Sequence, residues 1–259
     1  MDGTLIGAAA AGLGVAMLTT PAGVSGAVFL LPIQLGVLGV PSPAATPTNL
    51  LYNVIATPGG LLRWWRTGAV DPALTRLLVT AALPAVVVGA ALRATVLSGR
   101  LAVLIMVGTV LTALGAWLLM GARAGTRERD PARAAQIGVA GLAGLVGGAY
   151  GIGGGSVIAP ALVAMGIPAA RAAPAALATT FATSVAGILA FEGLAAAGVG
   201  AGQPVGPYWS VGIALGLGGL VGTHVGARLH ERIPERGLRR ALGLVALAVG
   251  VAYLITAGA

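Results

Sequence analysis

Residues 151–160 read GIGGGSVIAP, and residues 23–32 read GVSGAVFLLP. Both stretches begin with glycine and end with proline, and they lie 128 positions apart. After one deletion the register continues at an offset of 127, where it pairs Pro41 with Pro168, Pro47 with Pro174, Leu50 with Leu177, Asn53 with Thr180, Thr57 with Ser184 and Gly60 with Gly187. Three prolines in register are unusual by chance, so we interpret the chain as an internal duplication.

The sequence around these stretches is strongly apolar. Of 259 residues, 57% are hydrophobic, 43 are glycine and 8% are charged, against roughly 25% charged in a soluble domain. So few polar residues cannot cover a soluble surface, and we expect lipid as the solvent. With no cysteine and two histidines, we expect no metal site and no cofactor. The net charge of +8 comes without a basic stripe interleaved with aromatics, so no nucleic acid is expected.

Breaker residues divide the chain into ten apolar segments, which predict an all-α polytopic membrane protein with about 8–10 membrane segments. The predicted segments are 4–20, 24–40, 44–62, 72–92, 101–120, 135–150, 155–167, 170–191, 208–229 and 238–257. The one long polar connection, GARAGTRERDPARA at 121–134, is a basic cytoplasmic linker in this interpretation. It separates a first membrane repeat, 1–120, from a second, 135–259.

Five segments per repeat is an odd number, so the second repeat should enter the membrane in the opposite orientation. Threading the chain with both termini outside places every arginine except Arg93 and Arg100 on the cytoplasmic side, where positive residues collect. The loop RWWRTGAVD at 63–71 is basic, whereas its counterpart EGLAAAGVGAGQPVGP at 192–207 has no basic residue. This asymmetry favours two inverted-topology repeats.

The glycine-rich run predicts a helix that begins inside the membrane, since the apolar segment after it is too short to cross. Backbone N–H groups and the positive end of the helix dipole would form an anion site there. The residues that would contribute are Gly151, Gly153, Gly154, Gly155 and Ser156, with Gly23, Ser25 and Gly26 in the first repeat. A structural alternative stays open: the glycines allow close helix packing, and Ser25 bonds back to its own helix.

A polar stripe runs along the third segment, where Thr46, Asn49, Asn53 and Thr57 recur at spacings of three and four residues and share one helical face. The eighth segment carries Thr180 and Ser184 at the matching positions. The two stripes could line a central path and donate hydrogen bonds to an oxyanion. The alternative is that they only hold the bundle together through interhelical hydrogen bonds.

Residues 149–173 read AYGIGGGSVIAPALVAMGIPAARAA. A glycine-rich run, a short apolar helix ending at proline, then G-I-P and a small-residue helix resemble the sulfite exporter TauE/SafE family, the toluene sulfonate uptake permeases. The resemblance implies a permease or exporter of the cell (inner) membrane that moves sulfite, an organosulfonate or a related sulfur-containing or carboxylate anion. We expect alternating access with a possible coupling ion, proton or sodium.

Other functions remain as alternatives. A passive anion channel would use the same donors. Gly23 to Gly26 spell the G-x-S-G of rhomboid intramembrane proteases, with Ser25 as nucleophile and His224 as a distant base, but no enzyme activity is expected. His224 could instead carry a coupled proton, because imidazole exchanges protons near neutral pH. An inert structural module would have no use for duplicated broken helices.

Overall fold

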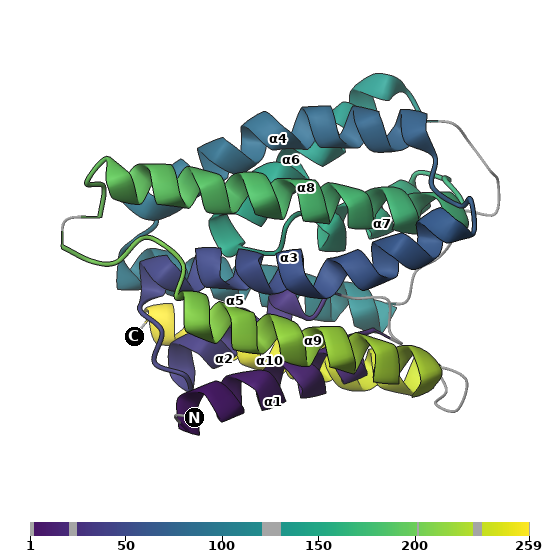
Figure 1. Cartoon of the computed structure of the whole chain (residues 1–259). Coiled ribbons are helices and arrows are strands. Elements are labelled where there is room, and N and C mark those ends of the chain that lie inside the picture. Colours follow the sequence, from purple (N-terminus) through teal and green to yellow (C-terminus); the bar gives the residue numbers. More distant parts are fainter. Residues whose placement is uncertain (1–2, 21–24, 121–130, 201, 230–234, 259) are drawn as a thin grey trace.

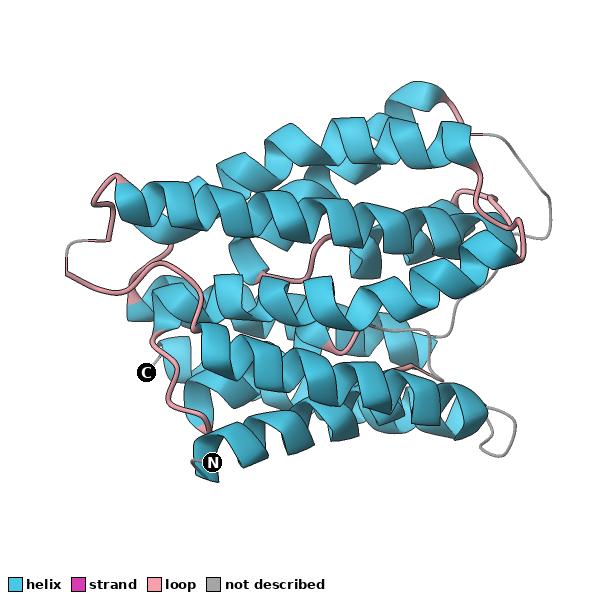
Figure 2. Ribbon diagram, viewed as in Figure 1, coloured by secondary structure: helices cyan, strands magenta, loops and turns pink. Residues whose placement is uncertain are grey.

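The computed structural model describes the chain except residues 1–2, 21–24, 121–130, 201, 230–234 and 259. The described residues form ten α-helices and no strand (Figures 1 and 2), as the ten predicted segments require. The helices are α1 Gly3–Thr19, α2 Ala27–Gly36, α3 Ser42–Arg66, α4 Pro72–Thr95, α5 Arg100–Met120, α6 Arg133–Tyr150, α7 Gly155–Ala164, α8 Ala169–Ala196, α9 Trp209–Leu229 and α10 Glu235–Gly258.

Five of these helices, α4, α5, α8, α9 and α10, are long and apolar enough to cross a membrane within the described part of the chain. Three apolar helices, α1, α2 and α7, are shorter, at 10–17 residues. The helices lie roughly along one common direction, and the two chain ends are at the same end of the bundle (Figure 1). The protein is therefore an all-α bundle that combines membrane-spanning helices with short ones.

The short helices coincide with the duplicated stretches. α2 and α7 have the same length and begin 128 positions apart, and each contains its proline, Pro32 or Pro160, at the sixth position. The next helix begins directly after Pro41 in the first half and after Pro168 in the second. Proline suits these starts because the first turn of a helix needs no N–H donor from it.

Three helix pairs make the most extensive contacts, and each pair packs through glycine: α1 with α9, α4 with α6 and α5 with α10. A side chain at Gly218 would meet the backbone of Ala9, one at Gly144 would lie 2.5 Å from the carbonyl oxygen of Ala82, and one at Gly115 would lie 2.5 Å from the Leu247 nitrogen. In lipid there is no hydrophobic force to join helices, so close backbone approach supplies the contact area. Many of the 43 glycines therefore serve packing.

We predict that Gly144→Leu destabilises the bundle, because its new Cβ must displace the α4 backbone at Ala82. Overpacking of this kind costs about 1–3 kcal/mol, and the thermal unfolding midpoint of the purified protein in detergent should fall by several degrees. Gly141→Leu is the matched control on the same helix, since nothing lies within 4 Å of a Cβ there. An equal loss in both variants would contradict the role of close packing.

Candidate functional site

The second helix break is built from glycine. α6 ends at Tyr150, α7 begins at Gly155, and the backbone between them has φ values of +89° at Gly151, +68° at Gly153 and +83° at Gly154. Residues other than glycine rarely adopt this left-handed backbone conformation. Residues 151–154 are also buried. The chain thus exposes peptide groups inside the bundle, at a place where only glycine fits without strain.

Side chains from α3 and α8 enclose this break. A Cβ at Gly151 would lie 2.6 Å from the carbonyl oxygen of Thr46, and one at Gly153 would lie 2.6 Å from Ser184 Oγ. One at Gly155 would collide with Thr180 Oγ1. The structure therefore brings together the glycine run, the α3 stripe and the α8 stripe, which the sequence placed far apart.

The first break is described only in part. Gly23 lies outside the described residues. Ser25 Oγ accepts a hydrogen bond of 3.3 Å from the N–H of Ala27, so this hydroxyl serves the start of its own helix. Gly26 is the residue before α2, and a Cβ there would lie 2.6 Å from the hydroxyl of Tyr52. The first break is thus also packed against α3.

The two asparagines of α3 reach different breaks. Asn49 Nδ2 donates to the carbonyl oxygen of Ala27 at 2.7 Å, and its Oδ1 accepts from Gln34 Nε2 at 3.1 Å. Asn53 Nδ2 donates to the carbonyl oxygen of Gly151 at 3.3 Å. Both asparagines are buried. The two amides therefore donate to backbone carbonyl groups at or beside the two breaks.

Other carbonyls of the breaks are satisfied in the same way. Thr183 Oγ1 donates to the carbonyl oxygen of Gly153. The buried Tyr150 hydroxyl donates at 2.9 Å to the carbonyl oxygen of Val28, across to the first half of the chain. Sequence reasoning singled out neither of these two residues as part of the site.

Several donors of the second break have no such partner. Ser184 Oγ and Ser156 Oγ are buried without a hydrogen bond among the described residues. The N–H groups of Gly153, Gly154 and Gly155 likewise donate to no acceptor in the described part of the chain, as expected at a helix start. Thr180 Oγ1 donates to the carbonyl of Ala176 at 3.0 Å, and Thr57 is buried on α3.

Arg93 is the polar residue whose environment the sequence reasoning misjudged. The predicted segment 72–92 left it in an outer loop, but α4 continues to Thr95 and the Arg93 side chain is fully buried. Its guanidinium donates to Thr46 Oγ1 at 3.0 Å, to both oxygens of Ser42 and to the Leu97 carbonyl. No carboxylate pairs with it among the described residues. Thr46 in turn donates to the carbonyl of Ala149, just before the break.

Comparison with known proteins identifies the family. The family model described as "Sulfite exporter TauE/SafE" matches residues 8–253. The chain belongs to the TauE/SafE family. Neither a curated protein nor a solved structure matches the chain. Members of the TauE/SafE family are transporters and not enzymes, so the protein is a multi-pass membrane transporter, and the protease alternative built on Ser25 is set aside.

The remaining candidate, His224, lies apart from these hydrogen bonds. It is exposed on α9, its Nδ1 is 3.0 Å from the carbonyl oxygen of Leu220, and it lies beside Gly59 of α3. A role for His224 in proton coupling therefore stays a prediction.

A double-mutant cycle tests how tightly this TauE/SafE protein encloses its second break. Gly155→Ala should lower the unfolding midpoint, because the new methyl group meets Thr180 Oγ1. Thr180→Ala alone removes one hydrogen bond worth about 1 kcal/mol, and in the double variant it should recover part of the loss. The expected coupling is at least about 1 kcal/mol, measured from thermal unfolding in detergent. If the two substitutions change the free energy of unfolding additively, the side chain of Thr180 does not restrict the space at Gly155.

Proposed function

We propose that this protein carries a small oxyanion across the membrane by alternating access, at a central site between its two helix breaks. Sulfite and organosulfonates are the first candidates, followed by other sulfur-containing anions and carboxylates. The observation that carries the proposal is the balance of donors and acceptors at the second break. The carbonyl groups of Gly151 and Gly153 accept from Asn53 and Thr183, whereas the N–H groups of Gly153, Gly154 and Gly155 have no described partner.

This balance favours an anion because an oxyanion brings only acceptors. The N–H groups of Gly153, Gly154 and Gly155 lie at the positive end of the α7 dipole, which adds to the attraction. The hydroxyls of Ser156 and Ser184 supply two further donors nearby. Glycine also lets a ligand approach the backbone closely, since no Cβ stands in the way. In the first half, Gly23, Ser25, Gly26, Asn49 and Thr57 would complete the site.

Arg93 extends the proposed site by one charge. A buried guanidinium without a carboxylate partner is costly in a membrane protein, and such residues are functional by default. Arg93 donates a hydrogen bond to Thr46, and Thr46 donates one to the carbonyl of Ala149, in the last turn of α6 before the break. The substrate anion would offset this charge, so we assign Arg93 as a positioning residue that acts through Thr46 and through the local field.

The proposed architecture is a pair of inverted repeats, α1–α5 and α6–α10. Exchanging each helix with its counterpart turns the contact of α1 with α9 into that of α6 with α4, and the contact of α3 with α9 into that of α8 with α4. α3 and α8 also run in opposite directions (Figure 1). Such repeats can rock against each other around a fixed central site.

The orientation of the chain follows from the positive-inside rule. The end of the bundle with Arg63, Arg66, Arg76, Arg133 and Arg171 would face the cytoplasm, and both termini would face outward from the cell membrane.

Reconstituted vesicles test the substrate. Labelled sulfite, an organosulfonate and a carboxylate should enter protein-containing liposomes faster than empty ones, with saturation and with acceleration by unlabelled anion on the opposite side. A flux that rises linearly with concentration and shows no such exchange would indicate the alternative, a passive anion channel. Imposed proton and sodium gradients identify the coupling ion, and His224→Gln should abolish an effect of the proton gradient if this residue carries the proton.

The same assay measures the role of Arg93. Arg93→Gln should raise the KM for the anion at least tenfold, while Arg93→Lys should recover part of the affinity because it retains the charge. Arg100→Gln is the matched control, since Arg100 is exposed at the start of α5 near the same end of α4. A variant with unchanged KM and only lower protein yield would make Arg93 a purely structural residue.

The chain contains no cysteine, so single cysteines report topology directly. Thr67→Cys lies in the exposed turn between α3 and α4, and Ala197→Cys lies in the exposed turn after α8. Inverted repeats with opposite entry place these turns on opposite sides of the membrane. A membrane-impermeant thiol reagent applied to whole cells should therefore label Ala197→Cys and spare Thr67→Cys. Equal labelling from outside would contradict the inverted arrangement.

A further inference from the structure

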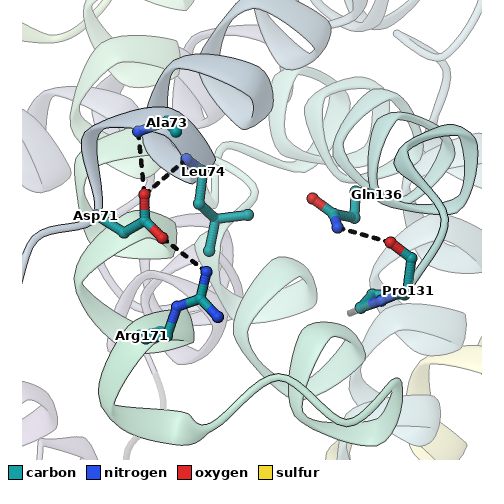
Figure 3. A network of polar contacts seen from close by, with 6 residues as sticks. All are labelled: Asp71, Ala73, Leu74, Pro131, Gln136 and Arg171. Carbon is teal, nitrogen blue, oxygen red and sulfur yellow. Dashed lines mark hydrogen bonds and ion pairs between the residues drawn. The ribbon is translucent and has the colours of Figure 1, made fainter. Parts of the chain in front are cut away.

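A cavity lies at the end of the bundle where α4, α6 and α8 begin. Its volume is about 670 Å³. The polar residues that line it are Asp71, Arg76, Thr80, Arg133, Gln136 and Arg171. In Figure 3, Asp71 and Arg171 lie on one wall and Gln136 on another, with the side chain of Leu74 between them. The proposed transport function makes no use of this cavity.

The charges around the cavity are strongly unbalanced. Three guanidinium groups come from three different helices, Arg76 from α4, Arg133 from α6 and Arg171 from α8. Asp71 is the one acidic residue among the described residues of the lining. Arg171 Nη2 forms an ion pair of 2.8 Å with Asp71 Oδ2. Arg76 and Arg133 are exposed and have no ion pair within the described residues. The described lining residues therefore carry a surplus of two positive charges.

Asp71 supplies a single negative charge, and hydrogen bonds hold its carboxylate in place beside Arg171. Oδ1 accepts hydrogen bonds of 3.0 Å from the N–H groups of Ala73 and Leu74 (Figure 3). The hydrogen bonds from Leu74 and Arg171 lower the pKa of Asp71, so this carboxylate stays ionised and fixed as the cap of α4. The positive ends of three helix dipoles also face this end of the bundle.

This cavity is separate from the central site. A buried apolar cluster lies deeper along the same helices, and it includes Leu78 of α4, Ala143 of α6, Ile158 and Leu162 of α7 and Ala176 of α8. The Gly154 position packs against Ala143, so the cluster stands between the arginines and the break. Leu74, Leu77 and Ile167 line the cavity as an apolar wall.

We propose that this cavity, defined by Arg76, Arg133 and Arg171, is a binding site for a phosphate-type oxyanion group. Two sources share this chemistry: the headgroup of an anionic phospholipid, whose chains would follow the apolar wall, and a free inorganic oxyanion. Basic pockets between membrane helices are suited to both, because the guanidinium groups are fixed by the helices and the phosphate can bridge them.

Direct binding measurements on the purified full chain in neutral detergent test the proposal, without any transport assay. One arm titrates short-chain phosphatidylglycerol, with phosphatidylcholine of equal chain length as the uncharged comparison. The other arm titrates inorganic phosphate and sulfate. The double variant Arg76→Gln/Arg133→Gln should weaken saturable binding about thirtyfold. Each arginine near an anionic headgroup contributes about 1 kcal/mol, which is about fivefold in affinity, and two are removed. Its unfolding midpoint reports whether the variant is folded.

Arg63→Gln/Arg66→Gln is the matched control, because it removes two exposed charges from the C-terminal end of α3 and neither residue lines the cavity. Saturable binding in the lipid arm alone identifies a headgroup site, and binding in both arms identifies a site for free oxyanions; either supports the proposal. Equal losses in the two double variants, or no saturable binding in either arm, would overturn it. The binding measurements involve no flux, so a negative result here would not affect the transport proposal. A negative flux result would likewise not affect the proposal for this cavity.

Discussion

The fold depends on one constraint: a peptide group inside a lipid bilayer needs a hydrogen-bond partner, because no water is present to supply one. Two helix breaks open the backbone near the centre of this bundle, and the polar side chains of α3 and α8 are arranged around them. Asn49 reaches Ala27, Asn53 reaches Gly151 and Thr183 reaches Gly153, each at a carbonyl oxygen. The breaks therefore explain why amides and hydroxyls occur in otherwise apolar helices.

Satisfying the carbonyls but not the N–H groups has an electrostatic consequence. A hydrogen bond to each carbonyl oxygen offsets its negative partial charge. The N–H groups at the start of α7 have no described acceptor, so their positive partial charge is not offset. Arg93 adds a full charge close by, and no carboxylate pairs with it in the part of the chain that the structure describes. Such an interior is unfavourable for cations and costly when empty, and this supports the proposed role as an anion carrier over that of an inert scaffold.

Much of the fold was predictable, because breaker residues act locally. Pro41 and Pro168 mark the starts of α3 and α8, and the glycine run marks the gap between α6 and α7. The ten predicted segments are confirmed for this reason. Arg93 was not predictable, since three more residues of α4 decide whether it faces a loop or the core, and helix ends are the least certain part of any sequence pattern. Tyr150 was missed because its partner, Val28, belongs to the other half of the chain.

The two breaks are not equivalent, and the differences have a direction. Asn53 crosses to Gly151, whereas Thr180, at the corresponding position of α8, bonds to Ala176 within its own helix. Ser25 similarly turns back to Ala27, while Gly153 at the matching position leaves its N–H without a described partner. Among the described residues, the second break thus keeps donors without partners, namely the N–H groups of Gly153, Gly154 and Gly155 and the hydroxyl of Ser184. On the proposed function, the anion would therefore lie closer to the second break, with the first break completing the site from the opposite side.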